Sequence, residues 1–424
     1  MGRPERRLAM GQYLTGLLLD GERKSIEPMA ARLGDRPDVV EAMRQRLQQC
    51  MVVSPWDAGE LFAPVARTLD RELPDITAFM VDDMGFPKKG RHSVGVARQY
   101  SGTLGRTDNC QIATSLHLDG ERGSGCIGMR LYLPEAWTAD RPRCQTAGVP
   151  DTVTFAPKWQ HALELLDQAL AAGVRQHVVL GDAAFGDMTA FRDALTARGL
   201  TYHLRVQGGL VVWPPGTTFT VPPRRGATGR PRSIPRLTRG GTPLTLAQVA
   251  ATLPHRRGTW REGLLGPQAS RFATVRVRLA HRHAEGAGPG SEVWLLSDWP
   301  RGEPAPTTCY LVVAGDHRAP HPRAAGQTPV AYRARLPGNE RRTEPRPFRG
   351  AVRGPGFITT PPYVPRPMRS WPCGGRVFPR RRVPWTPAAV RRHLQPLLLR
   401  RLPSCPLCGH ATSSAYLPRG PSRM

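Results

Sequence analysis

Two aspartates in the chain follow buried-type apolar runs, and their positions could hold a divalent metal ion. Asp82 follows the run TAFMV, and Asp182 follows the run HVVLG. The end of a buried strand is where an α/β sheet presents ligands into a crevice. Carboxylates suit a hard cation such as Mg²⁺, and two such ions can activate a water or a 3′-hydroxyl toward a phosphodiester. The alternative is that each aspartate forms a turn or caps a helix, which is the commoner use of this residue.

The sequence around both aspartates predicts strands and helices in alternation. The strand-like segments are TAFMVDD, QIATSLHL, GMRLYLPE, HVVLGDAAFG and TYHLRV. KWQHALELLDQALAAG predicts an amphipathic helix that stops at Gly173, and DMTAFRDALTARG predicts another. We therefore expect a mixed α/β core over residues 76–206 that carries both acids.

Three further regions surround this expected core. Residues 1–75 hold about three short apolar-periodic runs, which fit a helix-turn-helix DNA-binding region or a plain structural bundle. Residues 207–305 predict a β-rich insertion: the Pro/Gly/Arg-rich part 207–260 is an insertion or a loop excursion, and RFATVRVRLA and SEVWLLSDWP are strands. Beyond Arg301 the periodicity fails, so 306–380 is expected to be irregular. A helix returns at TPAAVRRHLQPLLLRRL within 381–424.

The charge of the chain points to a polyanionic partner. The net charge is +27, and residues 301–424 hold 22 basic residues against 4 acidic ones. Basic side chains favour nucleic acid because phosphate contacts release counterions. The chain has no apolar run long enough for a membrane span, and MGRPERRLAM lacks the apolar stretch of a signal peptide. We therefore expect a cytosolic protein whose eight cysteines stay reduced.

Long strings in the chain resemble one family of bacterial insertion-sequence transposases of the DDE superfamily. The string VDDMGFPKKGRHSVGVARQYSGTLGRTDNCQIATSLHL is similar to the segment around that family's first catalytic aspartate. GMRLYLPEAWTADRPRCQTAGVP, VVLGDAAFGDMTAFRDAL and GERKSIEPMAARLG also look like family segments, so the resemblance runs from about residue 10 to 300. It implies an RNase H-like core with a β-rich insertion before the third acid.

The resemblance also implies an activity and its requirements. Such enzymes cleave DNA and transfer its strands with Mg²⁺, or with Mn²⁺ in its place. Their partner is double-stranded DNA, both the element ends and the target, and they generally work as homodimers. The expected location is the bacterial cytoplasm, at the nucleoid.

Single residues carry over where the strings match. Asp82 corresponds to the first catalytic metal ligand and Asp182 to the second. Asp83 is the weaker candidate because the family accepts either acid there. Met84 stands where threonine is usual, which removes no ligand.

Basic residues near the first acid are candidates for DNA contact. Lys88, Lys89 and Arg91 could reach phosphates, or they could belong to an ordinary solvated turn. Residues 1–75 are expected to bind duplex DNA together with an arginine-rich segment that contains Arg224, Arg225, Arg230 and Arg232. Tyr100 is expected in the core or facing DNA rather than as a nucleophile.

The third acid of the family is missing from its expected place. The family has a helix of the form WRxERDYxExK there, and nothing in 301–380 reads so. If GC-rich codons for 330–340 are shifted by one base, they can spell WRTERDYREM, and later shifts give further family-like words in order. We therefore predict that residues 309–379 are out of frame; the alternative is a divergent Pro-rich linker. Glu340 and Glu344 are poor substitutes because both lie beside arginine in proline-broken sequence.

Other chemistry-bearing residues give weaker signals. Cys405, Cys408 and His410 cannot complete a four-ligand zinc shell, so free thiols are favoured. The histidines His92, His117 and His203 show no ligand spacing. The leading hypothesis is a DNA strand transferase impaired by loss of its third acid. The alternatives are a noncatalytic DNA-binding transposase remnant and, less favoured, a structure-specific nuclease.

Overall fold

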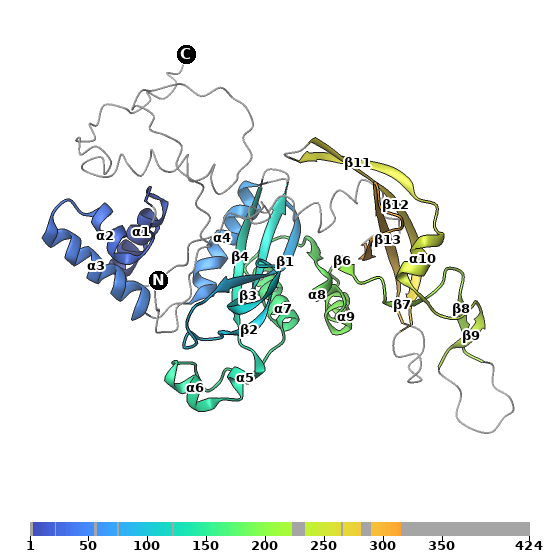
Figure 1. Cartoon of the computed structure of the whole chain (residues 1–424), viewed down its shortest axis with the longest axis horizontal. Coiled ribbons are helices and arrows are strands. Elements are labelled where there is room, and N and C mark those ends of the chain that lie inside the picture. Colours follow the sequence, from blue (N-terminus) through green and yellow to red (C-terminus); the bar gives the residue numbers. More distant parts are fainter. Residues whose placement is uncertain are drawn as a thin grey trace, which may run out of the picture.

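A computed structural model describes most of the first three quarters of the chain (Figure 1). The described residues are 3–21, 23–54, 57–73, 76–120, 123–222, 234–263, 266–280 and 290–314. The predicted irregular segment beyond residue 314 and the C-terminal helix therefore lie outside them.

The chain begins with three short helices that pack on one another. They are α1 (Pro4–Leu18), α2 (Ile26–Leu33) and α3 (Pro37–Val52). Met29, Ala30, Met43 and Leu47 are buried between α2 and α3. Helical structure in this region agrees with the sequence pattern. A fourth helix, α4 (Ala58–Glu72), begins at the Asp57 side chain, which accepts a hydrogen bond from Gly59 N.

The core is a five-stranded mixed sheet. Its strands are β1 (Ile76–Pro87), β3 (Arg106–Gly120), β4 (Gly123–Tyr132), β5 (Val178–Gly181) and β6 (Tyr202–Val206), in the order β4-β3-β1-β5-β6. β3 pairs antiparallel with β1 and β4, whereas β5 runs parallel to β1 and β6 runs parallel to β5. This is the RNase H-like mixed sheet expected from the sequence.

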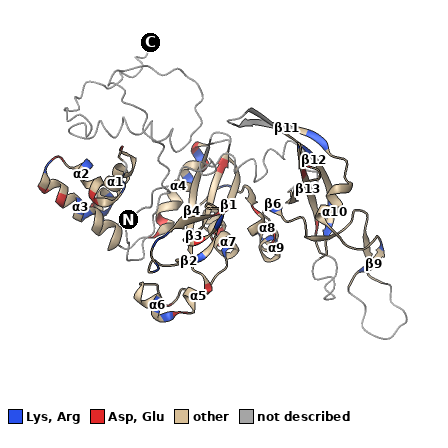
Figure 2. Cartoon of the chain, in the orientation of Figure 1, with Lys and Arg blue, Asp and Glu red and all other residues tan. Residues whose placement is uncertain are grey.

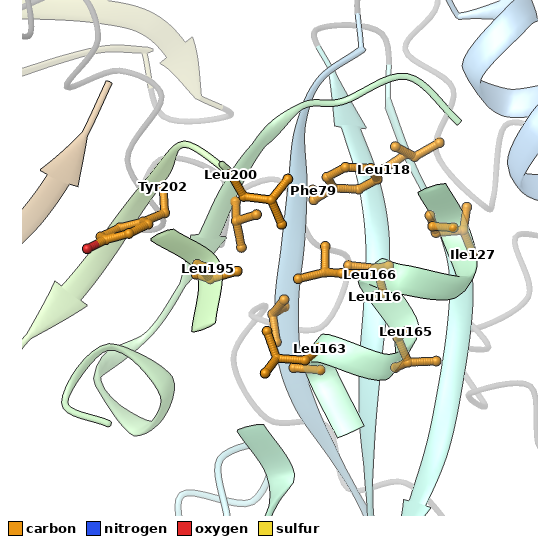
Figure 3. Close-up of a cluster of buried hydrophobic side chains, with 14 of the residues drawn as sticks. Phe79, Leu116, Leu118, Ile127, Leu163, Leu165, Leu166, Leu195, Leu200 and Tyr202 are labelled. Carbon is orange, nitrogen blue, oxygen red and sulfur yellow. The ribbon is translucent and has the colours of Figure 1, made fainter. Parts of the chain in front are cut away.

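Helices cover one face of this sheet. α7 (Lys158–Ala171) and α9 (Thr189–Ala197) pack there with apolar side chains of the strands (Figure 3). Ala66 of α4 belongs to the same buried cluster. Alternation along β1 turns Phe79 and Val81 toward these helices. Fully burying a leucine or phenylalanine side chain contributes about 1.5–3 kcal/mol, so this cluster holds β1 and β5 in place.

The insertion after β6 continues the sheet beyond its β6 edge. Its described elements are β7 (Val211–Trp213), β8 (Thr218–Thr220), β9 (Arg236–Arg239), β10 (Leu244–Thr245), α10 (Leu246–Thr252), β11 (Arg256–Gly263), β12 (Gly266–Leu279), β13 (Glu292–Pro300) and β14 (Thr308–Val313). β12, β13 and β14 pair in series, and β14 pairs antiparallel with β6. Figure 2 shows basic positions on β9, β11 and β12.

Some of these elements correct the sequence-based expectation. Residues 207–260, expected as an insertion or a loop excursion, contain short strands, which fit a β-rich insertion, and the helix α10, which was not expected and starts with a capping box between Thr245 and Gln248. Regular structure also continues past Arg301, because β14 pairs with β13 and β6. The sequence pattern further missed four short elements, β2 (Ala97–Ser101), α5 (Glu135–Thr138), α6 (Arg141–Thr146) and α8 (Ala183–Gly186).

Within the described residues, no helix is long and apolar enough to span a membrane. The cysteines in this part of the chain, Cys50, Cys110, Cys126, Cys144 and Cys309, are free thiols.

Candidate active site

The sheet brings Asp82 and Asp182 to adjacent positions. In the parallel pairing of β1 with β5, Val81 lies opposite Gly181. Asp82 follows Val81, and Asp182 follows Gly181. Neighbouring strands lie about 4.8 Å apart. Asp182 directly follows β5, as the sequence predicted. β1 continues to Pro87 because β3 pairs with it up to that residue, so Asp82 lies within its strand and not at the predicted strand end. The two aspartates lie side by side across the β1–β5 pair. That they share a metal ion stays a prediction.

Asp82 lies on the face of the sheet opposite α4, α7 and α9. Alternation places Ala78, Met80 and Asp82 on one side of β1, and the first two form a separate apolar cluster with Leu180 of β5. Asp182 follows Leu180 at the same spacing, and its backbone remains extended. Both carboxylates are half-buried at the rim of this apolar patch.

Local hydrogen bonds fix the orientation of each carboxylate. Asp82 Oδ1 accepts from the backbone N–H of Asp83 at 2.8 Å. Asp182 Oδ1 accepts from Ala184 N at 3.0 Å and so caps α8. The commoner role considered for Asp182, a helix cap, is thus present in the structure. A cap that uses Oδ1 leaves the residue compatible with a ligand role.

Asp83 is engaged elsewhere. Its side chain lies on the helix-covered side of β1, where Lys158 Nζ at the start of α7 donates to Asp83 Oδ2 at 2.6 Å. The two side chains are 17% and 27% exposed, so the ion pair is partly shielded from water. This pairing supports the preference for Asp82 over its neighbour.

Two linked hydrogen bonds from β3 support the backbone of β1 at Asp82. Ser115 lies opposite Asp82 on β3, and Ser115 Oγ donates to the carbonyl oxygen of Asp82 at 3.2 Å. His117 Nε2 lies 3.2 Å from Ser115 Oγ and must donate to it, because the hydroxyl proton is already used. Burial lowers the pKa of His117 to about 4, so the imidazole is neutral at pH 7.

The donor set fits one divalent cation better than two. Paired carboxylates are the oxygen ligands that Mg²⁺ and Mn²⁺ prefer. Across the described ranges, however, no group of three or more His, Cys, Asp or Glu side chains is placed to hold a metal. The third acid expected from the family pattern, and the poor substitutes Glu340 and Glu344, lie outside these ranges.

The predicted DNA-contact residues fall in two loops, and the structure describes one of them. Residues 88–96, called the basic loop below, connect β1 to β2. Lys89 and Arg91 are exposed, whereas Lys88 is half-buried and burial lowers its pKa. Tyr100, on β2, is 62% exposed, so it faces outward rather than into the core. Arg224, Arg225, Arg230 and Arg232 lie outside the described residues.

Sequence patterns did not reveal the residues that support the site. Lys158, Ser115 and His117 act through contacts between segments far apart in the chain, which no local spacing reveals. Asp70 of α4 also depends on such a distant contact, away from the site: its buried carboxylate receives hydrogen bonds from Arg175 and His177, just before the start of β5.

The strand order β4-β3-β1-β5-β6 and the helices on one face define an RNase H-like core. The chain matches the DDE superfamily endonuclease family over residues 1–267 and belongs to it. Endonucleases of this superfamily act on DNA and generally use divalent metal ions. The chain is also similar to "Probable transposase for insertion sequence element IS701" of Microchaete diplosiphon, with 30% identity over 186 residues. That match covers 42% of this chain and 42% of the relative.

Proposed function

We propose that this protein is an insertion-sequence transposase that cleaves DNA and transfers its strands in a metal-dependent reaction. The observation that carries the proposal is the β1–β5 register, which sets Asp82 beside Asp182. Family membership and the similarity to a transposase support the same reaction class. The proposed partner is double-stranded DNA, bound by a homodimer at the element ends and then at the target.

In this proposal Asp82 and Asp182 hold Mg²⁺, or Mn²⁺ in its place. When bound, such an ion polarises a phosphodiester and favours the deprotonated form of an attacking water or 3′-hydroxyl. The hydrogen bonds from Asp83 N and Ala184 N hold the two carboxylates in fixed orientations before metal arrives. The ion pair with Lys158 holds the Asp83 side chain on the face of β1 opposite to that of Asp82.

The basic loop supplies phosphate contacts in the same proposal. Lys89 and Arg91 follow Asp82 on the same polypeptide segment, and their side chains are exposed. Contacts to phosphates position a duplex without reading its sequence. For each phosphate that the protein neutralises, the slope of log affinity against log salt concentration becomes more negative by about 0.9.

We further propose that this copy is catalytically impaired. Two carboxylates leave a two-metal site short of anionic ligands, and the family's third acid has no counterpart in the in-frame sequence of 301–380. Loss of one ligand would lower the cleavage rate by orders of magnitude. The second candidate function is a noncatalytic DNA-binding remnant, and it rests on the absence of the family's WRxERDYxExK string from residues 301–380 of the sequence.

Metal binding and cleavage test these proposals separately. Mn²⁺ binding is measured on the full chain and on Asp82→Asn, Asp182→Asn and the control Asp167→Asn, whose carboxylate lies in an exposed ion pair with Arg198. The first two variants should lose binding and the control should keep it. Equal binding by all three variants would remove the proposed metal site.

Cleavage of duplex DNA with Mg²⁺ or Mn²⁺ then separates transposase from remnant. The chain as written should bind duplex DNA and show little or no cleavage. A gene with the frame of residues 309–379 restored should regain cleavage that depends on Asp82. Normal cleavage by the unrestored chain would refute the claimed impairment.

A further inference from the structure

The backbone of the basic loop is held by side chains from three other segments. Asn109 Nδ2, from β3, donates to the carbonyl oxygens of Lys88 at 2.6 Å and Gly90 at 3.0 Å. Gln111 Nε2 donates to Val94 O from the same strand. Because carbonyl oxygens can only accept, both amide groups must serve as donors.

The other side of the loop is held in the same way. Gln99 Nε2, on β2, donates to Gly95 O at 3.3 Å. Trp137 of α5 is buried, and its Nε1 donates to Val96 O at 2.8 Å. Arg143 of α6 donates to Arg91 O at 3.0 Å, while its guanidinium stacks 3.7 Å above the centre of the Trp137 ring.

These bonds turn the carbonyls of residues 88, 90, 91, 94, 95 and 96 toward the protein body. The loop is neither helix nor strand, so its carbonyl oxygens accept hydrogen bonds from these side chains instead of from a neighbouring strand. The tip of the loop, which carries Lys89, Arg91 and His92, stays exposed. Its cations are therefore displayed on a backbone that is already ordered.

An ordered loop binds a polyanion more tightly than a loose one with the same charge. Ordering each residue of a flexible loop on binding costs free energy, and this cost is avoided when the protein has fixed the loop beforehand. Asn109 is uncharged, so its removal would change the order of the loop without changing its charge. This separates positioning from direct contact.

We propose that Asn109 is a positioning residue for DNA binding: it locks the basic loop from β3, while Trp137 and Arg143 brace it from α5 and α6. This inference rests on the proposed contact between the loop and DNA. It gives several separate sequence strings the same role, which is to hold the basic loop; the most distant contact joins Arg143 to Arg91, 52 residues apart. The strings NCQ, RQY and EAWTADRPR all converge on this loop.

The test compares Asn109→Leu with a matched control in the full-length chain. The control, Gln176→Leu, removes a side-chain amide that donates to a different loop carbonyl, Gly199 O, at 3.1 Å. Binding to a mixed-sequence duplex of about three helical turns is measured over a range of salt concentrations. Asn109→Leu should weaken binding about tenfold at every salt concentration, with an unchanged salt slope. Gln176→Leu should bind normally.

A double-mutant cycle shows whether Asn109 acts through the loop. Lys89→Ala with Arg91→Ala should weaken binding and flatten the salt slope, since phosphate contacts are removed. In that background Asn109→Leu should add little, because the groups it positions are gone. Limited trypsin digestion gives a readout without DNA. Asn109→Leu should speed cleavage after Lys89 and Arg91, and the control should not.

The outcomes are distinguishable. Normal binding and normal trypsin resistance of Asn109→Leu, with a clear defect in the Lys89/Arg91 variant, would overturn this inference and leave the proposed contact standing. An equal defect of Asn109→Leu in both backgrounds would also overturn it, because the residue would then act on the whole fold. Normal binding by the Lys89/Arg91 variant would defeat the proposed contact itself, and the inference with it.

Discussion

The Asp70 carboxylate joins α4 to the segment that leads into β5, and its removal should be costly. Asp70 accepts hydrogen bonds from the backbone and side chain of Arg175, at 3.1 Å and 3.2 Å, and from His177 Nε2 at 2.9 Å. The side chains of Asp70 and His177 are each 8% exposed, whereas Arg175 is 59% exposed. His177 also packs edge-on against Phe79 of β1, with the ring centres 5.2 Å apart.

Asp70→Asn keeps the shape of the side chain and removes its charge. Hydrogen bonds to a charged group contribute about 1.5–3 kcal/mol. The variant leaves no buried charge unpaired, because Arg175 is 59% exposed and can turn into water, so we expect a loss of about 2 kcal/mol. In a domain of this size about 1 kcal/mol shifts Tm by roughly 2–4 °C, so Tm should fall by about 4–8 °C.

The effect should depend on pH in a defined direction. Burial raises the pKa of Asp70, but the hydrogen bonds from Arg175 and His177 outweigh it and hold the pKa below the ordinary value of 3.8. A carboxylate with a lowered pKa in the folded state contributes stability that is present above the unfolded pKa and lost as pH falls through the folded one. The difference in Tm between the wild-type protein and Asp70→Asn should therefore shrink below about pH 4.

Thermal unfolding followed by circular dichroism at pH 7 and at pH 3.5–5 measures both effects. The matched control is Asp167→Asn, which breaks an ion pair with Arg198 made of two hydrogen bonds of 2.9 Å each. The Asp167 side chain is 48% exposed and the Arg198 side chain is 35% exposed. That exposed pair should contribute at most about 1 kcal/mol. If the two variants lose the same stability at pH 7, burial does not set the strength of the Asp70 network and the reasoning fails.

Three further predictions concern the strands around the site. Gly186→Ala should lower the stability by at least about 3 kcal/mol in urea unfolding, because its Cβ would lie 1.8 Å from the carbonyl oxygen of Arg205. Gly85→Ala should also destabilise, by about 1–3 kcal/mol, because its Cβ would lie 1.9 Å from Ser101 Oγ. Adding Ser101→Gly should recover most of that loss; no recovery would show that another contact is responsible. His117, whose pKa falls from 6.5 to about 4 on burial, should make the protein less stable as pH drops from 6.5 to 4, by up to about 1.4 kcal/mol per unit. In a pH series of melting curves, His117→Gln should have a shallower slope over that window.

The sequence predicted the elements whose periodicity is strong. Helix α7 and the strands β5 and β6 lie close to the predicted segments, because each has a full apolar stripe or run that the core buries. The prediction that Asp182 follows a strand is confirmed for the same reason, whereas Asp82 lies within β1, because pairing with β3 carries that strand on to Pro87. Which strands are neighbours followed from the resemblance rather than from periodicity, since pairing is set by contacts across the sheet.

The elements that were missed are short or rest on distant partners. β14 is six residues long and follows a Pro-rich stretch, and it is a strand because β13 and β6 bind it on both edges. The α5 and α6 segment has no apolar period of its own, and it is ordered around the buried ring of Trp137. The predicted frame break near Cys309 stays a prediction; regular pairing continues through Val313.

The antiparallel pairing of β14 with β6 also sets a path length for whatever follows it. Val313 lies opposite Tyr202, at the start of β6, whereas Asp182 lies near the other end, beyond the Gly181–Leu204 pair. The chain thus leaves β14 at the far end of the sheet from the two aspartates. By register Asp182 lies level with Arg205, so the return distance is about three residues at roughly 3.3 Å each, or about 10 Å. A helix would need about seven residues, at 1.5 Å each, to bring a third carboxylate back along the sheet. If the proposed site needs a third carboxylate from the segment after β14, a functional copy of the gene must encode that returning segment in frame, and a point substitution just after β14 could not replace it.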